Sequence, residues 1–273
     1  MGGGDVTALV VDLVPVMRRR GPYRPPDDAE SAALGVLAGA LVRGDGAAAT
    51  ATGGSVGLTA TAVDDTLVLA SDPTTDRAWL VVVLRPGVAP DVVIEVPHPN
   101  ADLDTELIGL ALRDRRPAAL LLQAAAHRVA GAPQEATDRA DCPADVAARV
   151  DAPFSRVAAV LTACGLPQVQ LHGFADRDDV DVVLSPGAAA GGPLLDAVRA
   201  RLEAAGERVG TGEDPRWADL LGRRNVQGRE AAGWGAAFVH LELSRSLRRD
   251  PVRREAVAEA LAGALDDVLG VSR

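Results

Sequence analysis

Residues 91–106 read DVVIEVPHPNADLDTE, and this stretch decides the fold. Its first part, 91–97, is apolar after the initial Asp91 except for one glutamate, which is typical of a central β-strand covered on both faces. Pro99 ends this strand, and Thr105 opens a predicted helix. Because open α/β folds place their active sites at the carboxyl ends of the strands, His98 is predicted to lie at such a site.

The same alternation of strands and helices continues along the chain. Two helical segments, 6–19 and 28–42, precede three β-rich runs that are predicted to form an antiparallel meander at one sheet edge: 55–63, 66–70 and 79–84. Further strands are predicted at 118–126, 169–171, 180–184 and 236–243, and helices at 104–113, 153–164, 193–205 and 255–269. The pattern predicts a mixed, mostly parallel sheet between helical layers. One domain (1–273) is expected, with a helical N-terminal extension (1–50) before an α/β core (51–273).

The composition restricts the functions open to the chain. It has 273 residues, of which 48% are hydrophobic, and this is enough for a sizeable core. A net charge of −10 and an aromatic content of 3% argue against nucleic acid and anionic membranes as partners. The chain has no lysine, which excludes a Schiff base, a pyridoxal phosphate anchor and a phosphate-loop lysine.

The chain is expected to be cytoplasmic, or secreted if a leader peptide precedes this sequence. No apolar run reaches the roughly 18 residues that a membrane span needs. Near the N-terminus the basic cluster 18–20 follows the apolar stretch, which is the reverse of a secretory signal. Cys142 and Cys164 lack CxxC spacing, so two unpaired thiols are expected, although a disulfide between them stays open. The oligomeric state also stays open.

The positions of the four histidines indicate a metal site. His98, His127 and His172 each end a hydrophobic run. A strand that ends in an imidazole supplies a metal ligand or a proton carrier to the rim of the sheet. The fourth, His240, lies in FVHLELSRSLR two residues before Glu242, and on a strand this spacing places both side chains on one face.

His98 and Asp102 are separated by a short loop, so both can reach one cation. His172, in QLHG, is the predicted third ligand because Gly173 permits a tight approach after its strand. Two histidines and a carboxylate make a catalytic zinc site with one open position. The alternative is that Asp102 and Asp104 cap a helix and that His98 is an ordinary surface histidine.

Glu242 is the predicted general base. A glutamate on an apolar strand is costly to bury unless it faces a cation or a polar cavity, and burial raises its pKa towards the range of a general base. Beside a zinc-activated water, it would accept the proton and pass it to the leaving amine. The alternative is a structural ion pair with Arg245 or Arg248.

Further residues are candidates for binding the substrate. Arg128, which directly follows a strand, and Arg229, which lies in RRNVQGR with Asn225, are predicted to hold a substrate carboxylate or the oxyanion, because guanidinium groups bind carboxylates bidentately. His127 or His240 is predicted to assist the oxyanion. The expected partner is therefore a small molecule or peptide that carries a carboxylate.

The motifs HPNADLDTE, QLHG, RRNVQGR and FVHLELSRSLR, taken in this order, resemble a known family. They are similar to the zinc-dependent poly-γ-glutamate hydrolases and N-formylglutamate amidohydrolases, relatives of the zinc carboxypeptidases. The resemblance covers residues 91–250. It implies a three-layer α/β/α sandwich with a zinc carboxypeptidase-like architecture and zinc as the cofactor.

The resemblance also implies roles for single residues. His98 and His172 would be zinc ligands, and Glu242 would match the catalytic glutamate of the family's LEL strand. Asn225 and Arg229 would fall in the stretch that binds the substrate carboxylate or the tetrahedral intermediate. The chain departs from the family in three places: an aspartate at position 102 where relatives carry glutamate, the looser NVQGR spacing, and a histidine at position 240 where relatives usually place glutamine.

The favoured prediction is a zinc-dependent hydrolase that cleaves an amide or peptide-like bond. Two other functions stay open. A non-catalytic binding or scaffold protein would keep the fold with a degenerate site, and the departures from the family pattern favour it. A metal-free enzyme would use His127 or His172 with Asp141 or Asp102 and a serine such as Ser185, but the chain has no GxSxG motif.

Overall fold

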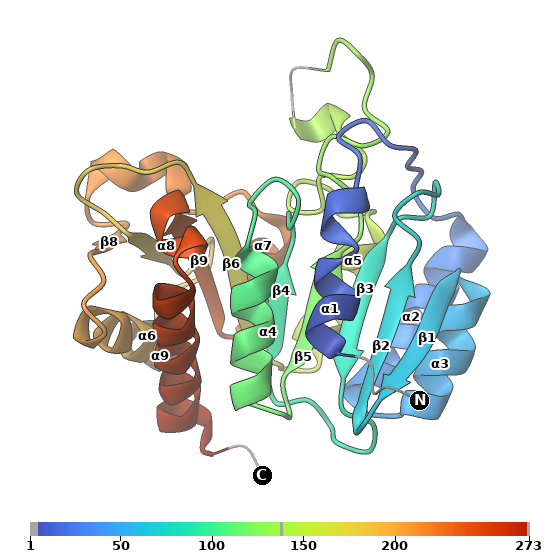
Figure 1. The fold of residues 1–273 in the computed structure, drawn as a ribbon, viewed down its shortest axis with the longest axis horizontal. Helices are drawn as coiled ribbons and strands as arrows, with labels where there is room; N and C mark the ends of the chain where they lie inside the picture. Colours follow the sequence, from blue (N-terminus) through green and yellow to red (C-terminus); the bar gives the residue numbers. More distant parts are fainter. Residues whose placement is uncertain (1–4, 137–138, 272–273) are drawn as a thin grey trace.

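A nine-stranded sheet forms the centre of the molecule (Figure 1). The computed structural model describes residues 5–136 and 139–271, and the sheet is counted within them. The strand order is β1-β2-β3-β5-β4-β6-β9-β7-β8. The strands are β1 Leu58–Val63, β2 Thr66–Ser71, β3 Leu80–Leu84, β4 Val93–Val96, β5 Leu120–Ala124, β6 Gln168–Phe174, β7 Val182–Ser185, β8 Val209–Thr211 and β9 Phe238–Ser244.

The central strands run parallel, whereas the margins of the sheet are mixed. β5, β4, β6 and β9 are parallel neighbours. β1, β2 and β3 form an antiparallel meander at one edge, as predicted, and β3 joins β5 in antiparallel pairing. On the other side, β7 is antiparallel to β9 and parallel to β8. Because the four central strands are parallel, their carboxyl ends meet at one edge of the sheet.

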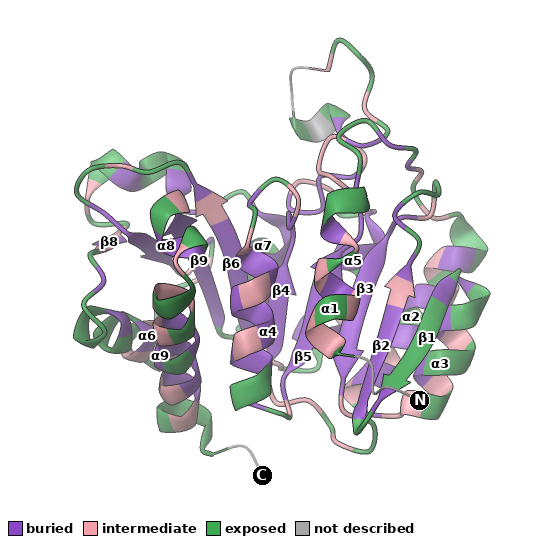
Figure 2. Ribbon diagram, in the orientation of Figure 1, coloured by how far each residue is buried: buried purple, intermediate pink, exposed green. Residues whose placement is uncertain are grey.

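Helices cover both faces of the sheet, so the predicted three-layer α/β/α sandwich is confirmed (Figure 1). An apolar cluster fills the space on each face. The central strands between the clusters are buried, whereas the edge strand β1 is mostly exposed (Figure 2). One face carries α1 Val6–Val11, α4 Thr105–Arg115, α6 Pro193–Ala204 and α9 Pro251–Leu269, with the short α8 Arg245–Arg249 before α9. The other face carries α2 Asp28–Val42, α3 Gly46–Ser55, α5 Pro153–Ala163 and α7 Val226–Trp234.

Two predicted elements near the N-terminus are wrong in extent. The helix predicted over 6–19 ends at Val11 and continues only as a 3-10 turn, because Pro15 lacks the N–H that a longer helix would need. The strand predicted from residue 55 begins at Leu58, because α3 occupies the preceding residues. The side chain of Asp45 accepts a hydrogen bond from the N–H of Ala48 and so caps α3.

Two further predictions concern the whole chain. Cys142 is buried and Cys164 is exposed, and no disulfide joins them within the described residues, as expected. Within the described residues, no helix is both long enough and apolar enough to cross a lipid bilayer. The division into an N-terminal extension and a core stays a prediction, and residues 1–4 of that extension lie outside the described part of the chain.

Candidate metal centre

The carboxyl ends of β4, β6 and β9 bring polar side chains to one place. His98 follows β4, His172 lies near the end of β6, and His240 and Glu242 lie in β9. In the parallel pairing of β6 with β9, His172 stands opposite Glu242, and Gln170 stands opposite His240. Alternate residues of a strand share a face, so these side chains of β6 and β9 lie on the same side of the sheet.

A tight turn carries Asp102 back beside His98. The backbone N–H groups of Ala101 and Asp102 donate to the carbonyl oxygen of His98, at 3.0 and 2.7 Å. Asp104 then adopts a left-handed conformation, with φ 73°, directly before α4. Its side chain makes no capping hydrogen bond and lies 2.6 Å from Arg245. Asp104 therefore occupies the N-cap position of α4, as the alternative expected, but its side chain does not cap the helix.

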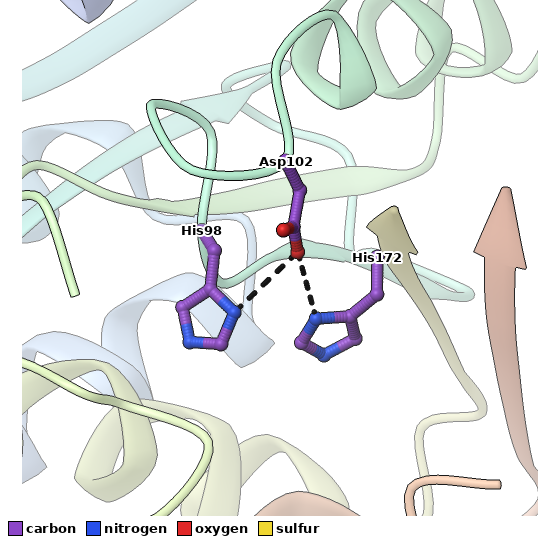
Figure 3. Close-up of side chains that lie close together, drawn as sticks. All are labelled: His98, Asp102 and His172. Carbon is purple, nitrogen blue, oxygen red and sulfur yellow. Dashed lines mark hydrogen bonds and ion pairs between the residues drawn. The ribbon is translucent and has the colours of Figure 1, made fainter. Parts of the chain in front are cut away.

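His98, Asp102 and His172 converge on a common point (Figure 3). Oδ2 of Asp102 lies 3.5 Å from Nδ1 of His98 and 3.1 Å from Nδ1 of His172. One ligand atom from each residue lies within 4.8 Å of the other two. All three residues are buried, so His98 is not a surface histidine. Two imidazoles and a carboxylate are a donor set that could hold a transition-metal ion.

The second nitrogen of each imidazole is held by a protein oxygen. Nε2 of His98 lies 3.0 Å from Oδ1 of Asp145, and Nε2 of His172 lies 3.1 Å from Oε1 of Gln170. Such acceptors favour a proton on Nε2, the tautomer in which the lone pair of Nδ1 can bind a metal. Nδ1 of His98 is buried and has no hydrogen-bond partner within the described structure. This orphaned nitrogen fits a metal ion as its missing partner.

Hydrogen bonds and opposite charges affect the pKa of some of these groups more strongly than burial does. Burial would raise the pKa of Asp102, but its hydrogen bonds with His172 and His98 hold that pKa well below its usual range. Burial also opposes a charge on His98, yet contacts with Asp102 and Asp145 raise the pKa of His98. Burial dominates for His172 and lowers its pKa. A neutral His172 is the form that binds metals.

Glu242 and His240 lie beside the three converging residues. Oε1 of Glu242 is 4.0 Å from Nε2 of His240. Burial, assisted by the charge of Asp102, raises the pKa of Glu242 to about 8. Burial holds the pKa of His240 well below its usual value. Neither ring nitrogen of this buried histidine has a hydrogen-bond partner within the described residues, and its ring centroid is 5.0 Å from that of His172.

A small polar cavity of about 80 Å³ opens between these side chains. Arg128 and Arg139 also border it. Nη2 of Arg128 and Nε of Arg139 bind Oδ2 of Asp145, at 3.2 and 2.9 Å. The two arginine side chains remain 30% and 45% exposed, so an incoming anion can reach both guanidinium groups.

The structure separates two predicted site residues from this cavity. His127 lies after β5, where its Nδ1 accepts a hydrogen bond from the N–H of Val129 at 3.2 Å. Arg229 is exposed on α7. Neither side chain borders the cavity, whereas Asn225 does, with its Nδ2 donating to Oε1 of Gln170 at 2.9 Å.

Other contacts test two alternatives: a structural ion pair between Glu242 and an arginine, and a metal-free enzyme with a serine nucleophile. Arg245 pairs with Asp104, and Nε of Arg248 donates to the carbonyl oxygen of Leu243 at 3.0 Å. Within the described residues, neither arginine forms an ion pair with Glu242. Oγ of Ser185 donates to the carbonyl oxygen of Leu221 at 2.6 Å, so this hydroxyl is not hydrogen-bonded to a histidine.

Sequence reasoning misses Asp145, Arg139 and Gln170. Asp145 and Arg139 lie in the irregular segment between β5 and α5, where no periodicity indicates which way a side chain points. Gln170 does carry a signal, because QVQLH places Gln168, Gln170 and His172 on one face of a strand at period two. Glutamines on the face that leads to a candidate ligand are candidates for orienting it.

The fold and the site together define an α/β/α protein with a His-Asp-His group at the carboxyl edge of its sheet that could hold a metal ion. No family model matches the chain, and no curated protein does.

Solved structures do match. The chain is similar to a bacteriophage poly-γ-glutamate hydrolase, with 17% identity over 66% of this chain and 86% of that chain and a TM-score of 0.46. It is also similar to a succinylglutamate desuccinylase from Vibrio parahaemolyticus, with 12% identity, coverage of 79% and 78%, and a TM-score of 0.45. A third match is the catalytic domain of an N-acetylmuramoyl-L-alanine amidase from Bacillus (Paenibacillus) polymyxa, with 12% identity, coverage of 66% and 98%, and a TM-score of 0.39. The first of these belongs to the family that the motifs resemble.

Proposed function

We propose that the protein is a zinc-dependent hydrolase that cleaves an amide or peptide-like bond in a small substrate bearing a carboxylate. One observation carries the proposal: two buried imidazoles and Asp102 converge, and the outward nitrogen of each imidazole faces a protein acceptor. This arrangement leaves both Nδ1 lone pairs directed at one point. We assign His98, Asp102 and His172 as the residues that would hold zinc.

A zinc ion, when bound, supplies a Lewis acid that polarises a carbonyl group and lowers the pKa of a water to about 7. Glu242 is the proposed general base. Its pKa of about 8 in the metal-free chain falls when a cation lies nearby, because an adjacent positive charge favours the carboxylate. The carboxylate then takes a proton from the attacking water and passes it to the leaving amine.

The other residues at the cavity bind and orient the substrate in this proposal. Arg128 holds the substrate carboxylate through its exposed guanidinium group. His240 is neutral, and its ring N–H has no hydrogen-bond partner among the described residues, so it donates a hydrogen bond to the carbonyl oxygen as negative charge develops there. Asn225, which also borders the cavity, orients the substrate. His127 and Arg229 do not border the cavity, and they are given no contact with the substrate.

Metal content and turnover test this proposal together. Plasma mass spectrometry should find one zinc per wild-type chain and none in the double variant His98→Ala, His172→Ala. Turnover is then screened on acyl amino acids and glutamyl peptides. Glu242→Gln should retain its zinc while kcat falls by a factor of about 100 or more, because it removes the general base.

Ser185→Ala is the matched control, because the Ser185 hydroxyl is occupied by Leu221. It should keep wild-type turnover, whereas an enzyme with a serine nucleophile would lose it. Undiminished activity in Glu242→Gln would remove the role assigned to that residue. A wild-type protein that takes up no zinc on incubation would refute the hydrolase and leave the non-catalytic binding protein in its place.

A further inference from the structure

A buried polar row lies beneath the converging ligands. β4, β6 and β9 are neighbours in the sheet, and their register places Glu95, Gln170 and His240 side by side. His172 lies two residues beyond Gln170, on the same face. Glu95 and Gln170 are fully buried, each with 0% of its surface exposed. The function proposed above uses Gln170 as an acceptor for His172 but gives Glu95 no role.

The amide of Gln170 is held in one orientation by its neighbours. Its Nε2 donates to Oε2 of Glu95 at 2.8 Å and to Oε1 of Gln227 at 3.2 Å. Its Oε1 accepts from Nδ2 of Asn225 at 2.9 Å. Acceptors therefore face the amide nitrogen, and a donor faces the amide oxygen. Turning the amide over would set donor against donor and acceptor against acceptor.

This orientation favours a proton on Nε2 of His172. It competes with two contacts that favour the other tautomer, because Oδ2 of Asp102 lies 3.1 Å from Nδ1 and Nδ2 of Asn225 lies 3.3 Å from Nε2. The amide oxygen of Gln170 lies 3.1 Å from Nε2 of His172, so it accepts a hydrogen bond from that nitrogen. A neutral imidazole with its proton on Nε2 has a free lone pair on Nδ1. Nδ1 is the atom that faces Asp102. A reversed amide would donate to Nε2 and move the proton to Nδ1, where the metal has to bind.

Burying the carboxyl group of Glu95 in this position lowers the stability of the fold. Its Oε1 is buried and has no hydrogen-bond partner among the described residues. Burial raises the pKa of Glu95 to about 8. An apolar residue on a central strand would avoid this penalty, and buried groups that break such a rule are commonly found at functional sites.

We propose that Glu95 is a positioning residue that, through Gln170, shifts His172 towards the tautomer able to bind metal. Because the benefit is a correctly prepared ligand, the inference rests on the proposed zinc site. Residues that orient a metal-binding histidine typically change metal affinity 10- to 100-fold when they are removed. We expect an effect at the lower end of that range, because Gln227 and Asn225 also hold the amide.

The test compares two apolar variants, Glu95→Leu and Glu95→Met, with the conservative variant Glu95→Gln. Long-range proton–nitrogen NMR spectra of the metal-free protein report the His172 tautomer, and four histidines keep these spectra simple. Zinc affinity is measured by competition with a chelator. The apolar variants should show a mixture of His172 tautomers and a zinc Kd raised about 10-fold. Glu95→Gln keeps an acceptor oxygen and should stay within about 3-fold of the wild-type Kd.

Glu106→Leu is the matched control, because Glu106 is another buried carboxyl with an unpartnered oxygen and lies outside the polar row. It should change neither readout. An unchanged tautomer and an unchanged Kd in a folded apolar variant would overturn the inference, as would an equal loss in the control. The two apolar replacements differ in shape, so either folded variant decides the question. If the wild type binds no zinc, the proposed function fails, while the tautomer comparison still decides the role of Glu95.

Discussion

The buried carboxyl of Glu106 should make the stability of the protein depend on pH. Glu106 lies in the first turn of α4, is 3% exposed, and has one oxygen without a hydrogen-bond partner within the described residues. Burial, assisted by the charge of Asp104, raises its pKa from 4.5 to about 7. At roughly 1.4 kcal/mol per pH unit, this shift corresponds to about 3 kcal/mol.

The direction follows from proton binding. Between pH 4.5 and about 7, the folded chain keeps a proton on Glu106 that the unfolded chain has lost. The folded state therefore binds more protons, and the free energy of unfolding falls as the pH rises through this window. Glu106→Gln cannot lose a proton there. The variant should gain about 3 kcal/mol relative to the wild type between pH 4.5 and pH 8.

Urea unfolding of both proteins at pH 4.5, 6 and 8 measures this change. Any packing difference between the carboxyl and the amide adds a constant offset at all three pH values, so only the change in the difference is used. Glu259→Gln, at an exposed position on α9, is the control for removing a carboxylate. If the difference between Glu106→Gln and the wild type varies by less than about 0.5 kcal/mol, Glu106 titrates as an ordinary exposed glutamate and the reasoning is wrong.

Three further predictions follow from close contacts and from the metal site. Gly222→Ala should lower kcat/KM about 10-fold or more with the fold retained, because Gly222 has φ +57° and a Cβ would lie 2.5 Å from the ring of His240. Gly173→Ala should destabilise the protein by about 1–3 kcal/mol in urea unfolding, because the added Cβ would clash with the buried guanidinium group of Arg248. Zinc at 100 times its Kd should add about 2.7 kcal/mol to the free energy of unfolding, and a chelator should remove it. An equal zinc effect in His98→Ala would contradict the assigned ligands.

Local patterns in the sequence are sufficient to predict the elements that build the centre of the fold. The helix predicted over 28–42 has the same bounds in the structure, because Asp27 and Glu30 form a capping box that marks its start. The antiparallel meander is predicted because Asp-rich turns separate short β-rich runs. By contrast, α7 is not predicted, because VQGREAAGW contains two glycines and has no side-chain cap at Asn225.

The ligands His98, Asp102 and His172 were predicted from strand ends and a short loop, and the structure brings them together. The assignment of roles to them stays a prediction. Asp145 could not be found in this way, because it reaches Nε2 of His98 from an irregular segment 47 residues away in sequence. The position of such a side chain is set by tertiary packing and leaves no local periodicity. Arg229 was predicted as a neighbour of Asn225, but the helical turn that begins at Asn225 directs Arg229 to solvent.

The polar row shows which information the sequence lacks. Each polar residue is visible in its own strand: Glu95 interrupts an apolar run, Gln170 precedes His172 at period two, and His240 precedes Glu242 in the same way. Their alignment into rows depends on the order β4-β6-β9 and on the register between these strands. Both are long-range properties, because the three strands are separated by more than 60 residues each. A buried polar residue on a central strand is therefore best interpreted as part of a row, because a neighbour across the sheet can supply one of the hydrogen bonds that its burial requires, as Glu95 does for Gln170.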